Sequence, residues 1–250
     1  MSPVKPDDYC ISNFPPKLRY IPNFISKEEE EFLRNRIYSC PSPRWVTLSG
    51  RRLQQWGGTP HPKGMLKERI PDWLHPFMDR VSDLGIFGEN KANHVLVNEY
   101  EPGQGISPHH DGPLYYPVVA TINLVSYGVL DFYQPLPPQS EPDTTDYASR
   151  YVGSALLQPR SLNIVSDLLY THYMHGIREL QSDRLLSQHP ADSGDFSSGC
   201  SVILNGEHQP CAFGNEGFLR RGTRISVTIR FVPKVSKIDA NRIWKTVKNR

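Results

Sequence analysis

The sequence predicts a mainly β protein whose core is a double-sheet jelly roll, the double-stranded β-helix of cupin-like proteins, with flanking helices. Two observations carry this prediction. Before about residue 91 the apolar positions show helical spacing, whereas from Asn93 onward short apolar segments alternate with turns that contain Gly and Pro. A helical start followed by eight strand-like segments is typical of two stacked sheets with helices covering one outer face.

Two helices are expected in the first third of the chain. Ser26 can cap the first helix, and the acids of Glu28–Glu31 suit the positive end of its dipole. Its apolar positions are Phe32, Leu33, Ile37 and Tyr38. The second helix is expected over about Pro71 to Leu84. Its apolar face, which predicts core packing rather than a cofactor site, consists of Trp73, Leu74, Phe77, Met78 and Val81.

Eight segments have the composition of strands, and Pro233 ends the last of them. They run from His94 to Tyr100, Ile106 to His110, Val118 to Leu124, Val129 to Gln134, Ser154 to Leu157, Ser161 to Ser166, Tyr173 to Arg178 and Arg224 to Val232.

The last strand alternates polar and apolar residues without a break. Its apolar face would carry Ile225, Val227, Ile229 and Phe231, and its polar face Arg224, Ser226, Thr228 and Arg230. Two guanidinium groups on one strand face predict a polar pocket that holds an anion.

A pattern typical of a metal site lies upstream in Pro108-His109-His110-Asp111-Gly112. On a strand or at its end, His109 and Asp111 project to the same side. A second His would complete the two-His, one-carboxylate set of non-haem Fe(II) oxygenases. His172 and His175 are the candidates for that position, and they face opposite ways on a strand because they are three residues apart.

Composition sets few limits on function. The formal net charge of +2 neither requires nor excludes a polyanionic partner. No apolar run resembles a signal peptide or a membrane span, so we expect a cytoplasmic or nuclear protein without a membrane partner. The spacing of the four cysteines indicates free thiols. Oligomeric state is left open.

The chain is expected to form one domain over residues 1–250. Within it, residues 14–91 would form a helical support, residues 92–233 the jelly-roll core and residues 234–250 a basic tail. Two polar insertions, residues 135–151 and 188–217, are predicted to be surface loops.

These motifs occur in a characteristic order. Asn98 and Tyr100 share a strand face and precede a Pro-Gly turn, the His-x-Asp pair, a His and the Arg-x-Ser-x-Thr-x-Arg strand. With the phrases Leu53–Gly58, Asn93–Asn98 and Asp111–Pro117, this order resembles the AlkB-homologue family of Fe(II)- and 2-oxoglutarate-dependent dioxygenases. The resemblance extends from about residue 19 to about residue 233.

The resemblance implies a complete set of site residues. His109, Asp111 and His175 would bind Fe(II), with His172 as the alternative third ligand. Arg224, Tyr100 and Ser226 would bind the distal carboxylate of 2-oxoglutarate. Asn98 and Arg230 would act nearer the metal, Arg230 as a catalytic residue. Molecular oxygen would complete the reaction, which oxidises a C–H bond.

The usual substrates of the family are alkylated bases in single-stranded or flipped-out DNA or RNA. Residues 44–58, with Arg51, Arg52 and Trp56, occupy the place of its substrate-recognition lid. A basic hairpin with a buried Trp is the equal alternative. Family members often have an acid two residues after the metal Asp, where this chain has Pro113, so Tyr115 and Tyr116 become candidates for lining the base pocket.

Three functions are therefore considered. The first is an oxidative demethylase of nucleic acid, which the Arg/Trp segment favours. The second is a 2-oxoglutarate oxygenase acting on a protein or small molecule, which Pro113 and the modest charge favour. The third is a low-turnover nucleic-acid-binding jelly roll.

Overall fold

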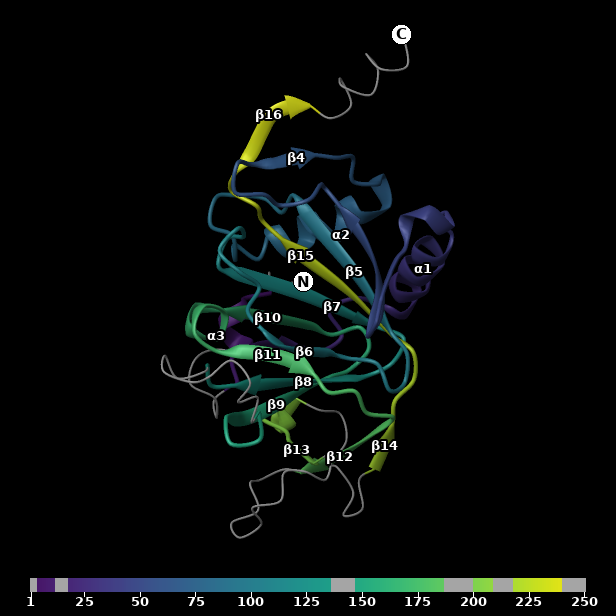
Figure 1. The fold of residues 1–250 in the computed structure, drawn as a ribbon, viewed down its shortest axis with the longest axis vertical. Coiled ribbons are helices and arrows are strands. Elements are labelled where there is room, and N and C mark those ends of the chain that lie inside the picture. The colour runs from purple at the N-terminus through teal and green to yellow at the C-terminus, as the bar shows by residue number, and fades with distance from the viewer. Residues whose placement is uncertain (1–3, 12–17, 136–146, 187–199, 209–217, 240–250) are drawn as a thin grey trace.

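The computed structural model describes residues 4–11, 18–135, 147–186, 200–208 and 218–239. Two antiparallel sheets stacked on each other form its centre, with the two longer helices on one side (Figure 1). This arrangement confirms the predicted jelly-roll core with flanking helices. The basic tail beyond residue 239 and most of both predicted insertions lie outside the described residues.

The larger sheet has seven strands. In spatial order they are β1 (Arg19–Ile21), β10 (Leu162–Ser166), β7 (Val118–Leu124), β15 (Arg224–Arg230), β5 (His94–Tyr100), β3 (Arg51–Trp56) and β2 (Val46–Leu48). The two motif-bearing strands, β5 and β15, are neighbours at its centre, and Arg224 pairs with Tyr100 while Ser226 pairs with Asn98. The polar faces predicted separately for these two strands therefore form one surface.

The smaller sheet has four strands. Their order is β6 (Ile106–His109), β11 (Met174–Ile177), β8 (Gly128–Tyr133) and β9 (Tyr151–Leu157). Two accessory sheets flank the sandwich, one of β13 (Cys200–Val202), β12 (Ser182–Leu186) and β14 (Phe218–Arg220), the other of β16 (Val235–Asp239) and β4 (Met65–Lys67). Strand β13 falls inside the predicted loop 188–217, which therefore is partly a buried strand rather than only a surface loop.

The helices are α1 (Lys27–Tyr38), α2 (His75–Ser82) and α3 (Asp167–Thr171), with short 3₁₀ turns at Pro6–Tyr9, Ser42–Arg44, Asp72–Leu74 and Gly206–His208. Ser26 and Glu29 form a reciprocal capping box at the start of α1. Both longer helices pack on the outer face of the larger sheet. In that core Leu33, Ile37, Phe77 and Val81 contact the cluster that holds Ile225, Val227 and Ile229.

This layering explains why polar and apolar residues alternate along β15. Its apolar residues are fully buried under the helices, and its polar residues face the second sheet. A separate apolar cluster, which includes Phe132, Ala155 and Val165, fills much of the space between the sheets. The polar face of β15 is therefore enclosed, although four hydrophilic side chains lie on it.

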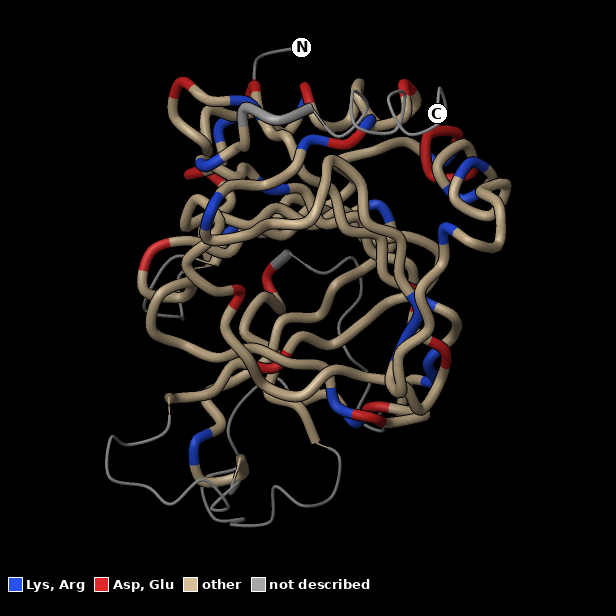
Figure 2. Tube along the Cα trace, turned by 45° about the horizontal axis from the view of Figure 1, so that its top comes forward, with Lys and Arg blue, Asp and Glu red and all other residues tan. Residues whose placement is uncertain are grey.

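Charged residues are spread over the outside of the molecule with both signs mixed, and the central strands carry few of them (Figure 2). No described helix is both long and apolar enough to span a bilayer. The described cysteines, Cys10, Cys40 and Cys200, form no disulfide bond with one another.

Candidate metal centre and co-substrate pocket

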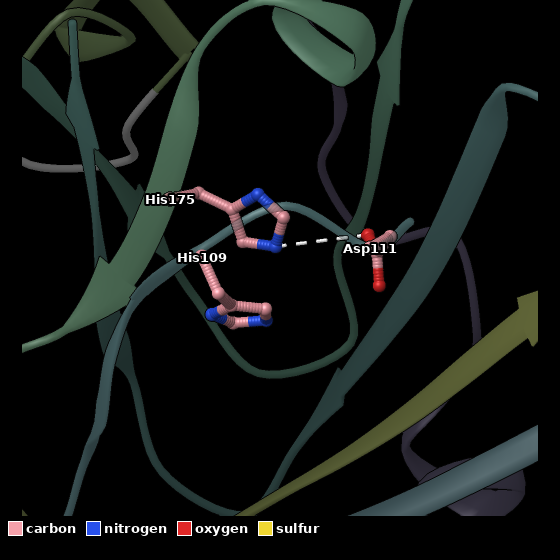
Figure 3. A group of neighbouring side chains, drawn as sticks. All are labelled: His109, Asp111 and His175. Atoms are coloured by element: carbon pink, nitrogen blue, oxygen red, sulfur yellow. Dashed lines mark ion pairs between the residues drawn. The ribbon is translucent and has the colours of Figure 1, made fainter. Parts of the chain in front are cut away.

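Three ligand-type side chains converge between β6 and β11. His109 ends β6, Asp111 follows two residues later, and His175 on β11 lies opposite His109 in the strand register. Their candidate ligand atoms all lie within 4.8 Å of one another. Figure 3 shows both imidazoles and the carboxylate directed toward a common point.

The turn after His109 places Asp111. Gly112 has a φ of +88°, a conformation that favours glycine. The Tyr170 hydroxyl donates to the Gly112 carbonyl at 2.7 Å, which ties this turn to α3. The chain can therefore leave β6 sharply and return the Asp111 carboxylate toward the two imidazoles.

One hydrogen bond sets the tautomer of His109. Its Nδ1 lies 2.8 Å from the carbonyl oxygen of Ser107, so the neutral ring donates its single proton there. The lone pair of Nε2 is then free for a metal ion. A backbone carbonyl on the remote nitrogen is a usual support for a metal-binding histidine.

The protonation states also suit a cation. Burial lowers the pKa of His175 to about 4 and lowers that of His109 as well, so both rings are neutral at pH 7. Burial alone would raise the pKa of Asp111, but the charge of Arg230 and the nearby imidazoles hold it below its ordinary value. Two neutral imidazoles and one carboxylate form a donor set that fits Fe(II) and leaves coordination positions open.

The other two histidines of these segments point elsewhere. His172 is exposed at the end of α3, and its ring lies against Tyr173. His110 is exposed, and its Nε2 donates to the His172 carbonyl at 3.0 Å. The structure therefore brings His175, and not His172, to His109 and Asp111.

A cavity of about 120 Å³ extends from this cluster between the two sheets. Its walls include every residue predicted for co-substrate binding: Asn98, Tyr100, Arg224, Ser226 and Arg230. Arg230 forms an ion pair with Asp111 and lies over the ring of Tyr115. Side chains suited to binding a metal ion and side chains suited to binding an anion thus line the same cavity.

Arg224 differs from Arg230 because no described acidic side chain pairs with it. Its residue is 5% exposed, and burial lowers its pKa to about 10, so the group stays charged at pH 7. Nη2 donates to Asn123, but Nε and Nη1 are buried and find no hydrogen-bond partner in the part of the chain that the structure describes. A buried cation in this state is costly unless an anion completes its hydrogen bonds.

Sequence reasoning missed three polar residues of the pocket. Thr121 on β7 and Asn163 on β10 line the cavity, and Asn123 anchors Arg224 from the β7 side. The signal was present as the alternations Thr121-x-Asn123 and Ser161-x-Asn163, which place these polar groups on the inner face of otherwise apolar strands.

The three residues predicted for the lid lie in different environments. Trp56 is only 8% exposed, lies under the guanidinium of Arg44 at 4.2 Å and meets Trp73 edge to face. Its assignment to a stacking lid is therefore wrong, because its ring belongs to the core that lies between the larger sheet and the helices. The alternative, a basic hairpin with a buried Trp, describes it correctly.

The two lid arginines point in different directions. Arg52 binds Glu99 through two hydrogen bonds and covers Trp45 at 4.4 Å. Arg51 instead lines the cavity and donates from Nε to Asn98 Oδ1 at 3.1 Å. Of the three lid residues, Arg51 alone reaches the pocket.

The two tyrosines after Pro113 also differ. Tyr116 packs edge to face on Phe87 and against Phe231, so it contributes to the core rather than to a base pocket. Tyr115 lies beside Arg230 and His94, with its ring 5.5 Å from the imidazole.

Comparisons with known proteins agree with this geometry. Residues 21–230 match the model of the 2OG-Fe(II) oxygenase superfamily, and the chain belongs to this superfamily. Within it the chain belongs to the AlkB homologues. It is 49% identical over 93% of both chains to the zebrafish (Danio rerio) protein called probable RNA/DNA demethylase ALKBH6.

More distant matches extend the picture. An uncharacterised protein, L905 of Acanthamoeba polyphaga mimivirus, is 26% identical over 86% of this chain and 84% of its own length. The solved structure of OsALKBH1 superposes with a TM-score of 0.51 at 12% identity, covering 86% of this chain and 96% of that one, which shows a shared fold.

The superfamily uses Fe(II), 2-oxoglutarate and molecular oxygen. The chain is therefore an Fe(II)- and 2-oxoglutarate-dependent dioxygenase, and the predicted resemblance and cofactors are confirmed.

Proposed function

We propose that this enzyme oxidatively demethylates an alkylated base in single-stranded or flipped-out nucleic acid. The observation that carries the proposal is that one cavity contains both a two-His, one-carboxylate cluster and the buried guanidinium of Arg224, which has no acidic partner among the described residues. The similarity to a relative described as a probable RNA/DNA demethylase supports the substrate class.

In this proposal His109, Asp111 and His175 hold the iron, and Arg230 orients the Asp111 carboxylate. When bound, Fe(II) supplies the activation of oxygen that is coupled to decarboxylation of the keto acid. The two neutral imidazoles can donate lone pairs without first losing a proton at pH 7.

In this proposal the polar residues of β5 and β15 that line the cavity bind 2-oxoglutarate. Arg224 takes the carboxylate far from the metal, because its Nε and Nη1 are buried and have no partner among the described residues, and because no described acid compensates its charge. Tyr100 and Ser226 complete the hydrogen bonds of that carboxylate. Asn98 and Arg230 serve the end nearer the metal, and Asn98 accepts a hydrogen bond from Arg51 of the β2–β3 hairpin.

Arg51 is the residue through which the hairpin contacts nucleic acid in this proposal. It lies in the cavity wall and carries a positive charge at the point where a flipped base and its phosphate would arrive. Tyr115, beside Arg230, offers a ring for stacking. Such substrates place the enzyme in the cytoplasm or nucleus.

A second candidate is oxidation of a protein or small molecule. Pro113 is exposed and cannot make the acidic base contact common in the family, and Trp56 is not available to stack on a base. These two observations favour a substrate other than an alkylated base.

Succinate formation tests both candidates. The protein is loaded anaerobically with Fe(II), mixed with 2-oxoglutarate and oxygen, and assayed with methylated single-stranded oligonucleotide, with unmethylated oligonucleotide, or with none. His109→Ala and Arg224→Ala should abolish turnover, and His172→Ala should retain it.

Stimulation of turnover, with release of formaldehyde, by the methylated strand alone supports demethylation. Turnover indifferent to nucleic acid supports the second candidate. Absence of turnover in metal-loaded wild type would instead favour a low-turnover binding module.

A further inference from the structure

Arg224 reaches across the sandwich to the opposite sheet. Its backbone belongs to β15 of the larger sheet, but its side chain packs on Gly128, the first residue of β8 in the smaller sheet. A Cβ atom at position 128 would lie 2.5 Å from Arg224 Cδ and 2.6 Å from Nε. These separations are below any normal carbon contact, so the guanidinium occupies the space that a side chain would fill.

The backbone does not explain this glycine. Gly128 is not among the residues with positive φ, so alanine could adopt its conformation without strain. What position 128 cannot accept is volume, because Cδ, Nε and Cζ of Arg224 all lie within 3.2 Å of the added atom. The absence of a side chain at 128 therefore serves the placement of Arg224.

Asn123 holds the same guanidinium from the larger sheet. It is fully buried, and its Oδ1 accepts from Arg224 Nη2 at 2.6 Å. Its own Nδ2 donates to Ser161 Oγ and to Asn163 Oδ1, both at 3.1 Å. These bonds orient the amide so that its oxygen, and not its nitrogen, faces Arg224.

Asn123, which holds the Arg224 guanidinium, carries no charge. An aspartate of the same size would pair with Arg224 and compensate its charge, as Asp111 does for Arg230. The amide instead fixes one guanidinium nitrogen and leaves the net positive charge, with Nε and Nη1, available to a ligand.

We propose that Gly128 and Asn123 are positioning residues for the co-substrate: Gly128 leaves room for the Arg224 guanidinium, and Asn123 orients it without neutralising it. This inference rests on the proposed role of Arg224 in binding the distal carboxylate of 2-oxoglutarate. Neither residue would touch the reacting atoms. Both act by setting where, and with what charge, Arg224 meets a dicarboxylate.

The test is the dissociation constant of 2-oxoglutarate, measured by anaerobic calorimetry on Fe(II)-loaded protein. Gly128→Ala should weaken binding about 10- to 100-fold, the range typical of residues that orient a binding group, because the added methyl group displaces the Arg224 guanidinium. Asn123→Asp should weaken it at least as much, because the new carboxylate competes with the ligand for Arg224. Fe(II) affinity should stay within about twofold of wild type, and KM for 2-oxoglutarate should rise more than kcat falls.

Gly206→Ala is the matched control, since a Cβ there meets nothing within 4 Å, and it should bind 2-oxoglutarate like wild type. Wild-type affinity in folded Gly128→Ala and Asn123→Asp would overturn the inference while leaving the proposed function intact. If Gly128→Ala does not fold, Asn123→Asp decides alone. A wild-type enzyme that binds no 2-oxoglutarate would refute the proposed function and this inference together.

Discussion

Arg230 binds one oxygen of Asp111 and leaves the other facing the metal position. Its Nη2 pairs with Oδ1, while Oδ2 lies 3.7 Å from Nε2 of His175. The two carboxylate oxygens thus have separate partners. Arg230, the last residue of β15, thereby controls the orientation of a candidate iron ligand in the turn that follows β6.

Replacing Arg230 should therefore weaken metal binding. Arg230→Gln removes the charge that holds the carboxylate in place, and we expect Fe(II) or Mn(II) affinity to fall about 10- to 100-fold, as for other groups that orient ligands. Anaerobic metal titration measures this. Arg69→Gln, which breaks an exposed pair with Asp72, is the control. Unchanged metal affinity in Arg230→Gln would show that Asp111 needs no such support.

The choice between the two downstream histidines can be tested directly. His175→Ala should abolish metal binding, because it removes one of three converging ligands. His172→Ala should bind metal like wild type, because that ring is exposed beside Tyr173. Electron paramagnetic resonance of Mn(II)-loaded protein distinguishes the two, and the reverse pattern would transfer the ligand assignment to His172.

Trp56 should matter for stability rather than for nucleic acid. Trp56→Ala removes a buried indole, which typically costs about 3–5 kcal/mol in free energy of unfolding. Urea denaturation measures the loss. A variant as stable as wild type, but unable to bind oligonucleotide, would restore Trp56 to the lid.

Arg51 should matter for binding nucleic acid rather than for stability. Arg51→Ala should reduce the slope of log binding constant against log salt concentration by about 1 for a methylated single strand, as expected for one lost phosphate contact. Fluorescence anisotropy across a salt series measures the slope. Arg36→Ala, an exposed arginine on α1, provides the comparison. Equal slopes for wild type and Arg51→Ala would exclude Arg51 from the nucleic-acid interface.

The start of α1 should confer pH-dependent stability. The hydrogen bond from Arg80, together with the one that the backbone N–H of Ser26 donates, lowers the pKa of Glu29 in the folded state. Its ionised form therefore stabilises the fold above the unfolded pKa, and this contribution is lost as pH falls through the lower, folded value. Glu29→Gln keeps the capping geometry and should cost about 0.5 kcal/mol at pH 7.

Urea denaturation at pH 7 and at pH 3 measures this dependence. The difference between Glu29→Gln and wild type should shrink at pH 3. Glu31→Gln, at an exposed position on the same helix, is the control. A difference that persists unchanged at pH 3 would contradict a role for the Glu29 charge.

Local patterns were enough to predict the two longer helices and the strands β5 to β11 and β15, but not β1 to β4, β12 to β14 or β16. Strands β5 and β7 have the predicted bounds, because each is a short segment rich in β-branched residues that a turn follows. The capping box at Ser26 is equally local. The predicted second helix, Pro71 to Leu84, is found as a 3₁₀ turn that continues into α2.

Local patterns did not separate alternatives that depend on what lies across the sandwich. His172 and His175 occur in one short segment, and only the pairing of β11 with β6 brings His175 to His109. Trp56 looked available for stacking until the helices were placed over the outer face of its sheet.

The sequence by itself determined which residues could carry the chemistry: the His-x-Asp pair, the Asn-x-Tyr strand and the arginine strand. Only the tertiary structure decided that Arg224 has no acidic partner among the described residues, because its neighbours come from distant parts of the chain. Asn123 lies 101 residues away in sequence, and Gly128 approaches from the opposite sheet. Charge, orientation and space at that guanidinium are set by the stacking of two sheets, which no periodicity within one strand can specify.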